Sequence, residues 1–208
     1  MRVDELKMRV RAKIDELGPN DSDMIDIDKD NKELDRIIKD CALGALQYLL
    51  MNADVSKLDC KEGNPPATIS SENVAVVQLP DDCLRVVSVR LSSWRSSATD
   101  IVTENSPAYL MQADPYACGT PERPVAALVH PGGKRSLELY KASKQGDSCT
   151  LHYVAAPVYD SSVLGDESVE VPMLLEHAFV YHVASLVMQA YGENGTALAE
   201  TAKQLAGI

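Results

Sequence analysis

Three acidic residues at alternate positions, Asp26, Asp28 and Asp30, form the pattern closest to a calcium site in this sequence. Carboxylate oxygens at this spacing open the calcium-binding loop of helix–loop–helix proteins. The rest of that loop does not match, because its sixth position is Asn31 instead of glycine and its twelfth is Ile37 instead of glutamate. We therefore expect a solvated acidic loop in which Asp28 or Asp30 caps the following helix, and no calcium site.

Two histidines, His177 and His182, follow Glu176 on one expected helix. Helical zinc sites place two histidines four residues apart, so that both side chains face one metal ion. The spacing here is five, which turns the two side chains about 140° apart around the helix axis. His130 and His152 have no cysteine at ligand spacing. We expect packed or hydrogen-bonded histidines and no zinc site.

Motifs for phosphate binding and nucleophilic catalysis are also incomplete. Residues 131–134, PGGK, lack the spacing of a phosphate-binding loop, and a strand instead of a helix is expected to follow them. The sequence has no G-x-S-x-G elbow, no G-x-G-x-x-G motif, and no cysteine in a recognisable catalytic context. We expect a hairpin turn at residues 131–134. No residue is assigned a catalytic, cofactor-binding or metal-binding role, and the chain is expected not to be an enzyme.

Trp94, the single tryptophan, follows an expected strand and has two interpretations. It either packs on a sheet face or anchors a partner protein.

Before that strand, Pro80 fixes its own φ, and Asp81 or Asp82 can bond backbone amides, which favours a turn between two strands.

Composition narrows the function classes further. The 208 residues are 45% hydrophobic and 25% charged, as in an ordinary globular chain of one or two domains. The formal net charge of −11 argues against a protein that mainly neutralises phosphates, and 5% aromatic residues argue against a base-stacking platform.

Five cysteines without a C-x-x-C pair predict thiols in a reducing compartment. Residues 1–7 lack the apolar core of a secretory signal, so we expect a cytosolic chain.

Apolar residues at helical spacing predict helices at both ends of the sequence. The first covers residues 3–17 and ends at Gly18 and Pro19, and the second covers residues 34–49 after an acidic stretch at 20–31. Residues 172–191 are apolar on nearly every side, which predicts a buried helix with neighbours all around and no membrane span. A last helix is expected at residues 196–206.

Between these helices the apolar period changes to two, which is typical of strands. We expect a surface connection over residues 55–73, then about six strands and a short helix at 106–112. The expected strands cover residues 74–79, 83–91, 101–104, 125–129, 137–140 and 149–155. Turns at residues 131–134 and 144–147 favour one antiparallel meander.

The predicted fold class is therefore α+β. Residues 1–73 and 157–208 form a helical bundle, and residues 74–156 form an inserted antiparallel β-sheet or small sandwich. The charge follows this division, because residues 74–156 are neutral overall while residues 157–208 carry a formal charge of −6.

Several runs of residues, taken in order, resemble one protein family. The run LPDDCLRVVSVRLSSW at 79–94 precedes SPAY at 106–109, YACGT at 116–120, PVAAL at 124–128, LELY at 137–140 and LHYVAAP at 151–157. With the alanine- and tyrosine-rich helix pair that follows, this order resembles the head-to-tail connectors of short-tailed phages, also called tail tubular protein A-like or ring proteins. KIDEL at 13–17 and ELDRII at 33–38 are most similar to the versions in crAss-like phages.

This resemblance implies a virion protein of the tail or neck, assembled in the host cytoplasm. Twelve copies would form a ring beneath the portal protein, with tail proteins below and a passage for double-stranded DNA without sequence-specific binding. The family has no catalytic residues, cofactor or membrane partner to transfer. Because the sequence ends at Ile208, two residues after the last expected helix, we expect portal docking to use a surface other than a long C-terminal extension. The alternatives are another ring or adaptor of the tail, and a cytosolic hydrolase.

Overall fold

The structure, a computed structural model, describes residues 1–15, 27–70, 73–114, 116–142, 147–160 and 167–208, with side chains described from residue 32 onward in the second range. Asp26 and the side chains of Asp28 and Asp30, on which the expected calcium pattern depends, lie outside this description. Residues 27–31 were expected in an acidic loop, but their backbone is helical, so Asp28 and Asp30 lie within the first turns of the helix and the expectation that either one caps it is wrong.

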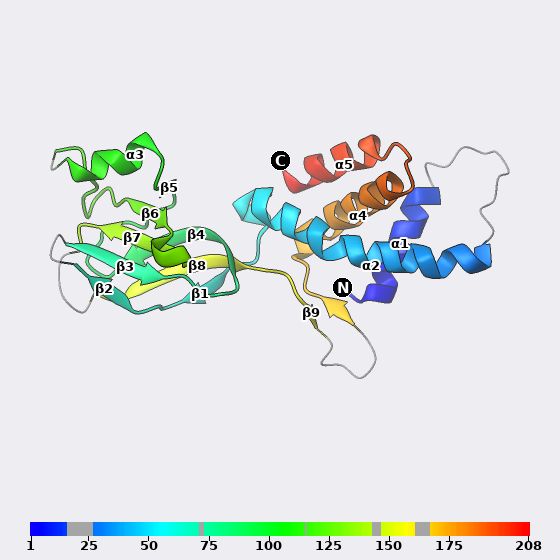
Figure 1. The fold of residues 1–208 in the computed structure, drawn as a ribbon, viewed down its shortest axis with the longest axis horizontal. Helices are drawn as coiled ribbons and strands as arrows, with labels where there is room; N and C mark the ends of the chain where they lie inside the picture. Colours follow the sequence, from blue (N-terminus) through cyan, green and yellow to red (C-terminus); the bar gives the residue numbers. More distant parts are fainter. Residues whose placement is uncertain (16–26, 71–72, 115, 143–146, 161–166) are drawn as a thin grey trace. The chain divides into compact units, whose positions relative to one another are not determined.

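The chain divides into two compact units (Figure 1). The helical unit comprises residues Met1–Asp59 and Ala156–Ile208, and the sheet unit comprises Cys60–Ala155. The fold is α+β, with N- and C-terminal helices and an inserted sheet, as the sequence predicts. The unit boundaries lie at 59/60 and 155/156, whereas the sequence places them at 73/74 and 156/157. The larger difference arises because two short strands in the expected surface connection pair with strands of the sheet unit.

The helical unit is built around one buried helix. Its longer helices are α1 (Val3–Asp15), α2 (Ile27–Asn52), α4 (Glu176–Ala190) and α5 (Thr196–Ala206). Helix α4 packs against the other three, as expected for a helix that is apolar on nearly every side. Phe179 and Val183 of α4 are fully buried, and a fully buried side chain of this kind stabilises the fold by about 1.5–3 kcal/mol.

Short elements complete the helical unit. They are η1 (Val55–Lys57), η4 (Met173–Leu175), β9 (Tyr159–Asp160) and β10 (Ser168–Val169), with β9 and β10 paired antiparallel. Pro172 was expected to begin the long apolar helix, but it precedes the 3₁₀ turn η4, and α4 begins at Glu176.

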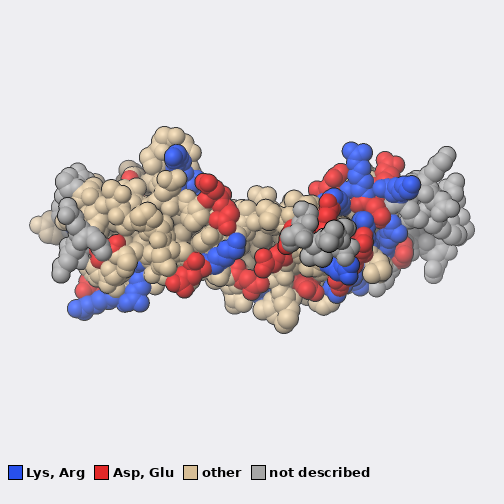
Figure 2. All heavy atoms as spheres, turned by 90° about the horizontal axis from the view of Figure 1, so that it is seen from below, with Lys and Arg blue, Asp and Glu red and all other residues tan. Residues whose placement is uncertain are grey.

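Ion pairs tie the surfaces of these helices together. Asp35 of α2 forms ion pairs with Lys7 and Arg11 of α1, and Arg9 pairs with Glu176 of α4. On the face drawn in Figure 2, acidic and basic side chains interleave over the helical unit, whereas most of the sheet unit's visible surface carries neither. Exposed pairs of this kind contribute only about 0–1 kcal/mol each, so the apolar core around α4 dominates the stability.

The sheet unit contains two sheets that share one core. Its strands are β1 (Lys61–Gly63), β2 (Ala67–Ile69), β3 (Val74–Gln78), β4 (Cys83–Leu91), β5 (Ile101–Thr103), β6 (Ala126–Val129), β7 (Ser136–Tyr140) and β8 (Cys149–Ala155). The sheet orders are β1-β8-β4 and β2-β3-β7-β6-β5, and only the β5–β6 pairing within them is parallel. The expectation of one antiparallel meander is therefore wrong. Strand β7 belongs to the five-stranded sheet and β8 to the three-stranded sheet, so the chain crosses between the sheets after β7. Both strands contribute leucines to the core between the sheets.

Trp94 belongs to this core. Its side chain is 2% exposed and packs among buried residues of both sheets. The packing interpretation of Trp94 is confirmed, and the interpretation as a surface anchor is wrong. Asp82 also differs from expectation: its carboxylate accepts hydrogen bonds from the Tyr153 hydroxyl and the Lys61 ammonium group instead of closing its own turn.

One face of the five-stranded sheet carries a short helical segment (Figure 1). Helix α3 (Pro107–Leu110) and the 3₁₀ turn η2 (Met111–Ala113) follow β5. Ser106 caps α3, because its side-chain oxygen accepts from the Tyr109 amide at 3.2 Å, and Pro107 occupies the first turn, where its missing N–H costs nothing.

Candidate functional site

Strand alternation places two polar side chains of β7 on the face of the sheet that carries α3. Leu137 and Leu139 point into the shared core, while Glu138 and Tyr140 are half-buried on the opposite face. In the register of β3 with β7, Val76 lies opposite Glu138 and Val74 lies opposite Tyr140. A carboxylate and a phenol thus stand beside an apolar strip.

The segment that follows α3 is fixed by a glutamine and a glycine. The Gln112 side chain donates to the Ala108 carbonyl at 2.8 Å and accepts from the Gly119 amide at 2.8 Å. A Cβ atom on Gly119 would lie 2.9 Å from the backbone nitrogen of Val125, so only glycine fits this approach. The turn therefore closes tightly against the start of β6.

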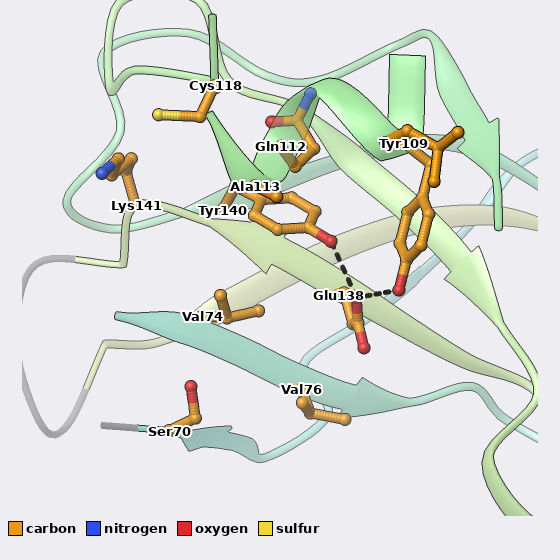
Figure 3. Close-up of a pocket in the computed structure, with 11 residues that line it drawn as sticks. Ser70, Val74, Val76, Tyr109, Gln112, Ala113, Cys118, Glu138, Tyr140 and Lys141 are labelled. Carbon is orange, nitrogen blue, oxygen red and sulfur yellow. Dashed lines mark hydrogen bonds between the residues drawn. The ribbon is translucent and has the colours of Figure 1, made fainter. Parts of the chain in front are cut away.

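Between this segment and the sheet lies a pocket of about 540 Å³ (Figure 3). Its walls combine apolar side chains, two tyrosine rings and a few charged or polar groups. The lining residues are Ser70, Val74, Val76, Tyr109, Leu110, Gln112, Ala113, Cys118, Glu138, Tyr140 and Lys141.

Glu138 is the polar centre of the pocket. Its Oε2 atom accepts hydrogen bonds from the Tyr140 hydroxyl at 2.8 Å and from the Tyr109 hydroxyl at 3.2 Å. The two rings meet edge to face, with centroids 6.5 Å apart. Burial, followed by the charge of Glu138 and the hydrogen bonds to it, raises the pKa of both tyrosines above its usual value. Both phenols therefore remain protonated donors at neutral pH.

Lys141 lies at another part of the pocket in a strained backbone conformation. Its φ of 60° is in the left-handed region, which is uncommon for a residue other than glycine. Figure 3 shows Lys141 and Cys118 on one side of the Tyr140 ring, with Glu138 and Tyr109 on the other. The pocket thus has a cationic end and an anionic end.

The site residues weighed from the sequence do not converge. His177 is exposed, and His182 is half-buried against the Tyr48 ring, with centroids 4.9 Å apart. Residues 131–134 lie in the β6–β7 hairpin turn, as the sequence predicts. Gly132 and Gly133 have positive φ in this turn. In the described part of the chain, no three His, Cys, Asp or Glu side chains gather closely enough to hold a metal ion.

The five cysteines are present as thiols. Two of them, Cys83 and Cys149, are buried in the core of the sheet unit. Burial raises the pKa of the Cys149 thiol to about 11. Because the thiolate is the reactive form, Cys149 is a packing residue and not a nucleophile at neutral pH.

Sequence reasoning assigned no role to Tyr109, Glu138 or Tyr140, although all three lie in the runs that resemble the connector family. One signal was present: Glu138 stands between two leucines in a strand, so it must share a face with Tyr140. No comparable signal predicts that Tyr109 approaches Glu138, because the two residues are 29 positions apart and local periodicity relates only near neighbours.

The helical unit presents a second feature, an exposed apolar patch that we call the η4 patch. It consists of Val55, Met173, Leu174, Leu205 and Ile208, which are 40–80% exposed. Turn η4 contacts both η1 and α5, and the Lys57 ammonium group donates to the Leu205 carbonyl at 2.7 Å, so the three elements lie together. Apolar groups gathered on a surface are typical of interaction sites.

None of the described helices combines the length and the hydropathy that crossing a bilayer requires. No protein-family model matches the sequence, and no curated protein matches it.

Proposed function

We propose that this chain is a structural virion protein that forms a head–tail connector ring beneath the portal of a short-tailed phage. The ring provides a passage for DNA and a platform for tail proteins, and the chain has no catalytic activity. The ordered runs between residues 79 and 157 that resemble connector proteins support this function, as does the helical bundle with an inserted sheet.

The η4 patch carries the proposal on the structural side. A ring subunit must bury surface against two neighbours, and apolar side chains supply most of the free energy of such contacts. Met173 and Leu174 are 80% and 60% exposed in the isolated chain, although both are large and apolar. Contact with the adjacent subunit would remove them from water.

Charge is consistent with a channel through which DNA moves. The helical unit has 11 Lys and Arg against 21 Asp and Glu, whereas the sheet unit has 9 against 10. Acidic residues facing the channel would repel phosphates, which keeps contacts with DNA weak and allows sliding. Another ring or adaptor of the same tail would share these requirements.

The direct test is assembly on the portal. The purified chain is mixed with the portal protein encoded by the same genome, and the products are examined by native mass spectrometry and electron microscopy. We expect a ring of connector subunits bound to the portal. A chain that remains monomeric and does not bind the portal would overturn the proposal. A ring found elsewhere in the virion would favour the adaptor alternative.

A pair of matched variants tests the role of the η4 patch. Leu174→Asp places a charge in the patch, and Met8→Asp places the same charge on α1, where Met8 is 67% exposed. Both positions are exposed, so both variants should unfold at nearly the wild-type temperature. We expect Leu174→Asp to reduce ring formation on the portal at least tenfold and Met8→Asp to leave it unchanged. Equal assembly by the two variants would exclude the η4 patch from the interface.

A further inference from the structure

The pocket of the sheet unit has hydrogen-bonding properties that select its ligand. Each tyrosine hydroxyl donates its only hydrogen to Oε2 of Glu138. The two hydroxyls also interact with each other, but each phenol oxygen carries more than one lone pair, so acceptor capacity remains at this end of the pocket. Within the described residues, no donor bonds the second carboxylate oxygen, Oε1. This end of the pocket is rich in acceptors, and its hydroxyl donors are already used, so it fits a ligand group rich in N–H donors.

We propose that this pocket binds a lysine or arginine side chain from a segment of a partner protein, with its cationic group paired to Glu138. The site lies in the sheet unit and does not depend on the η4 patch. The inference therefore goes beyond the ring proposal, and either can fail while the other holds.

The surroundings of Glu138 suit a cation on an alkyl stem. The faces of Tyr109 and Tyr140 attract positive charge, an effect that operates within about 6 Å of a ring centroid. Val74, Val76 and Leu110 supply apolar wall, along which methylene groups can lie. Because two phenols hold the Glu138 carboxylate in place before the ligand arrives, little side-chain entropy is lost on binding.

Lys141 determines the orientation of the ligand. Its ammonium group repels a second cation on its side of the Tyr140 ring, so the ligand's positive charge belongs at the Glu138 side. Lys141 also leaves that side of the pocket suited to a neutral or negative part of the partner, such as a backbone carbonyl.

The rim of the pocket indicates a protein segment in preference to a free organic amine. Leu110 lines the pocket and is 71% exposed, and the adjacent Met111 is 56% exposed. A peptide that inserts a basic side chain would cover these apolar groups, whereas a small amine would leave them in water.

The test uses the full chain and three defined probes. The first is the peptide Ac-Leu-Arg-Leu-NH2, the second replaces arginine by citrulline, which has nearly the same shape and no charge, and the third is agmatine, a free guanidine. Binding is followed by NMR shifts of backbone amides, including those of Gly119 and Tyr140. We expect the arginine peptide to bind at least tenfold more tightly than the other two. Equal binding of the citrulline peptide would overturn the proposal, and equal binding of agmatine would overturn the protein segment as its source.

Variants separate this site from non-specific attraction. Glu138→Gln removes the charge but retains an oxygen that can accept from the tyrosines, so it should abolish the preference for arginine over citrulline. Glu62→Gln is the matched control, because Glu62 is an exposed strand carboxylate outside the pocket, and it should retain the full preference. If both variants lose the preference equally, the site is wrong.

A second pocket variant keeps the test decisive if Glu138→Gln does not fold. Tyr109→Phe removes one phenol acceptor and one hydrogen bond to Glu138, and should weaken arginine-peptide binding severalfold while leaving the thermal unfolding temperature nearly unchanged. Unaltered arginine-peptide affinity in folded Tyr109→Phe would overturn the proposed recognition by the tyrosine–glutamate cluster.

Discussion

A buried nitrogen of His182 distinguishes this side chain from the other three histidines. In the described part of the chain, its Nδ1 atom has no hydrogen-bond partner, and its ring packs against Tyr48 of α2. Burial, with a smaller contribution from the charge of Lys203 on α5, lowers the pKa of His182 below its ordinary value of 6.5. The neutral form is therefore the one that the folded helical unit accommodates.

This shift predicts a loss of stability in mild acid. As the pH falls from about 7 to about 5, the unfolded chain takes up a proton at His182 more readily than the folded chain, so the free energy of unfolding decreases. His182→Phe keeps a ring against Tyr48 and cannot titrate. We expect urea denaturation to show a shallower fall in stability for His182→Phe than for the wild type across this range.

The control for this prediction is His177→Asn, because His177 lies on the same helix and is exposed. Its pH dependence should match that of the wild type. If His182→Phe and the wild type lose stability in parallel, the packing of His182 does not govern the acid response.

At the residue scale, the sequence predicts half of the pocket's polar centre. Alternation in residues 136–140 establishes that Glu138 and Tyr140 share a face. Tyr109 joins them only because the chain between β5 and β6 returns across the sheet, and no local pattern encodes that path. The exclusion of Trp94 from the surface likewise depends on both sheets, since residues from each surround it.

At the scale of elements, the backbone just before α5 approaches α4 closely. A Cβ atom built on Gly195, the residue before α5, would lie 2.5 Å from the Ser185 carbonyl oxygen and 3.0 Å from the Ser185 Cα atom. Both are backbone atoms of α4, which cannot move aside as a flexible side chain can. Glycine at this position thus sets the distance between the two helices.

Two glycine-to-alanine variants should change stability in opposite directions. Gly195→Ala forces α5 away from α4, and overpacking of this kind costs about 1–3 kcal/mol. Gly44→Ala lies inside α2, where the added methyl group meets nothing within 4 Å, and alanine stabilises a helix interior by about 0.5–1 kcal/mol. Thermal unfolding should show a lower midpoint for Gly195→Ala and a higher one for Gly44→Ala. A neutral Gly195→Ala variant would contradict the close approach.

Most long elements follow from the sequence, whereas the short strands and the sheet pairing do not. Helix α5 has the expected bounds, and β4 and β8 match their apolar runs. Strand β1 ends at Gly63, and only the three residues Asn64-Pro65-Pro66, whose composition is typical of a loop, separate it from β2. The two strands form because β1 pairs with β8 and β2 pairs with β3. Which strands pair within each sheet is decided by tertiary contacts that local periodicity does not encode, so the sequence pattern favoured a single meander.

At the scale of the whole molecule, charge is distributed unequally between the two units. The helical unit carries a formal charge of −10 and the sheet unit −1. The η4 patch therefore lies on the more strongly charged unit, where apolar attraction between copies competes with like-charge repulsion.

Salt should shift this competition. Raising the ionic strength from roughly 0.01 M to about 1 M shortens the screening length from about 30 Å to about 3 Å, while apolar contacts persist. Without a portal, we expect the purified chain to be monomeric or weakly associated at low salt and more associated at high salt, as measured by light scattering. A stable large ring at low salt and micromolar concentration would show that burial at the η4 patch outweighs repulsion and that the portal is not needed for closure.

The central place of α4 has a consequence for the chain as the ribosome makes it. Helices α1 and α2 emerge first, but the helix they pack against is complete only after roughly 140 further residues, or about 7–28 s at typical elongation rates. The sheet unit is contiguous and can fold during that interval, while the apolar faces of α1 and α2 await their partner. In ribosome-bound chains arrested after the sheet unit has emerged, protease should cut within Met1–Asp59 and spare Cys60–Ala155. Equal protection of both segments would mean that the N-terminal helices find another partner before α4 is made.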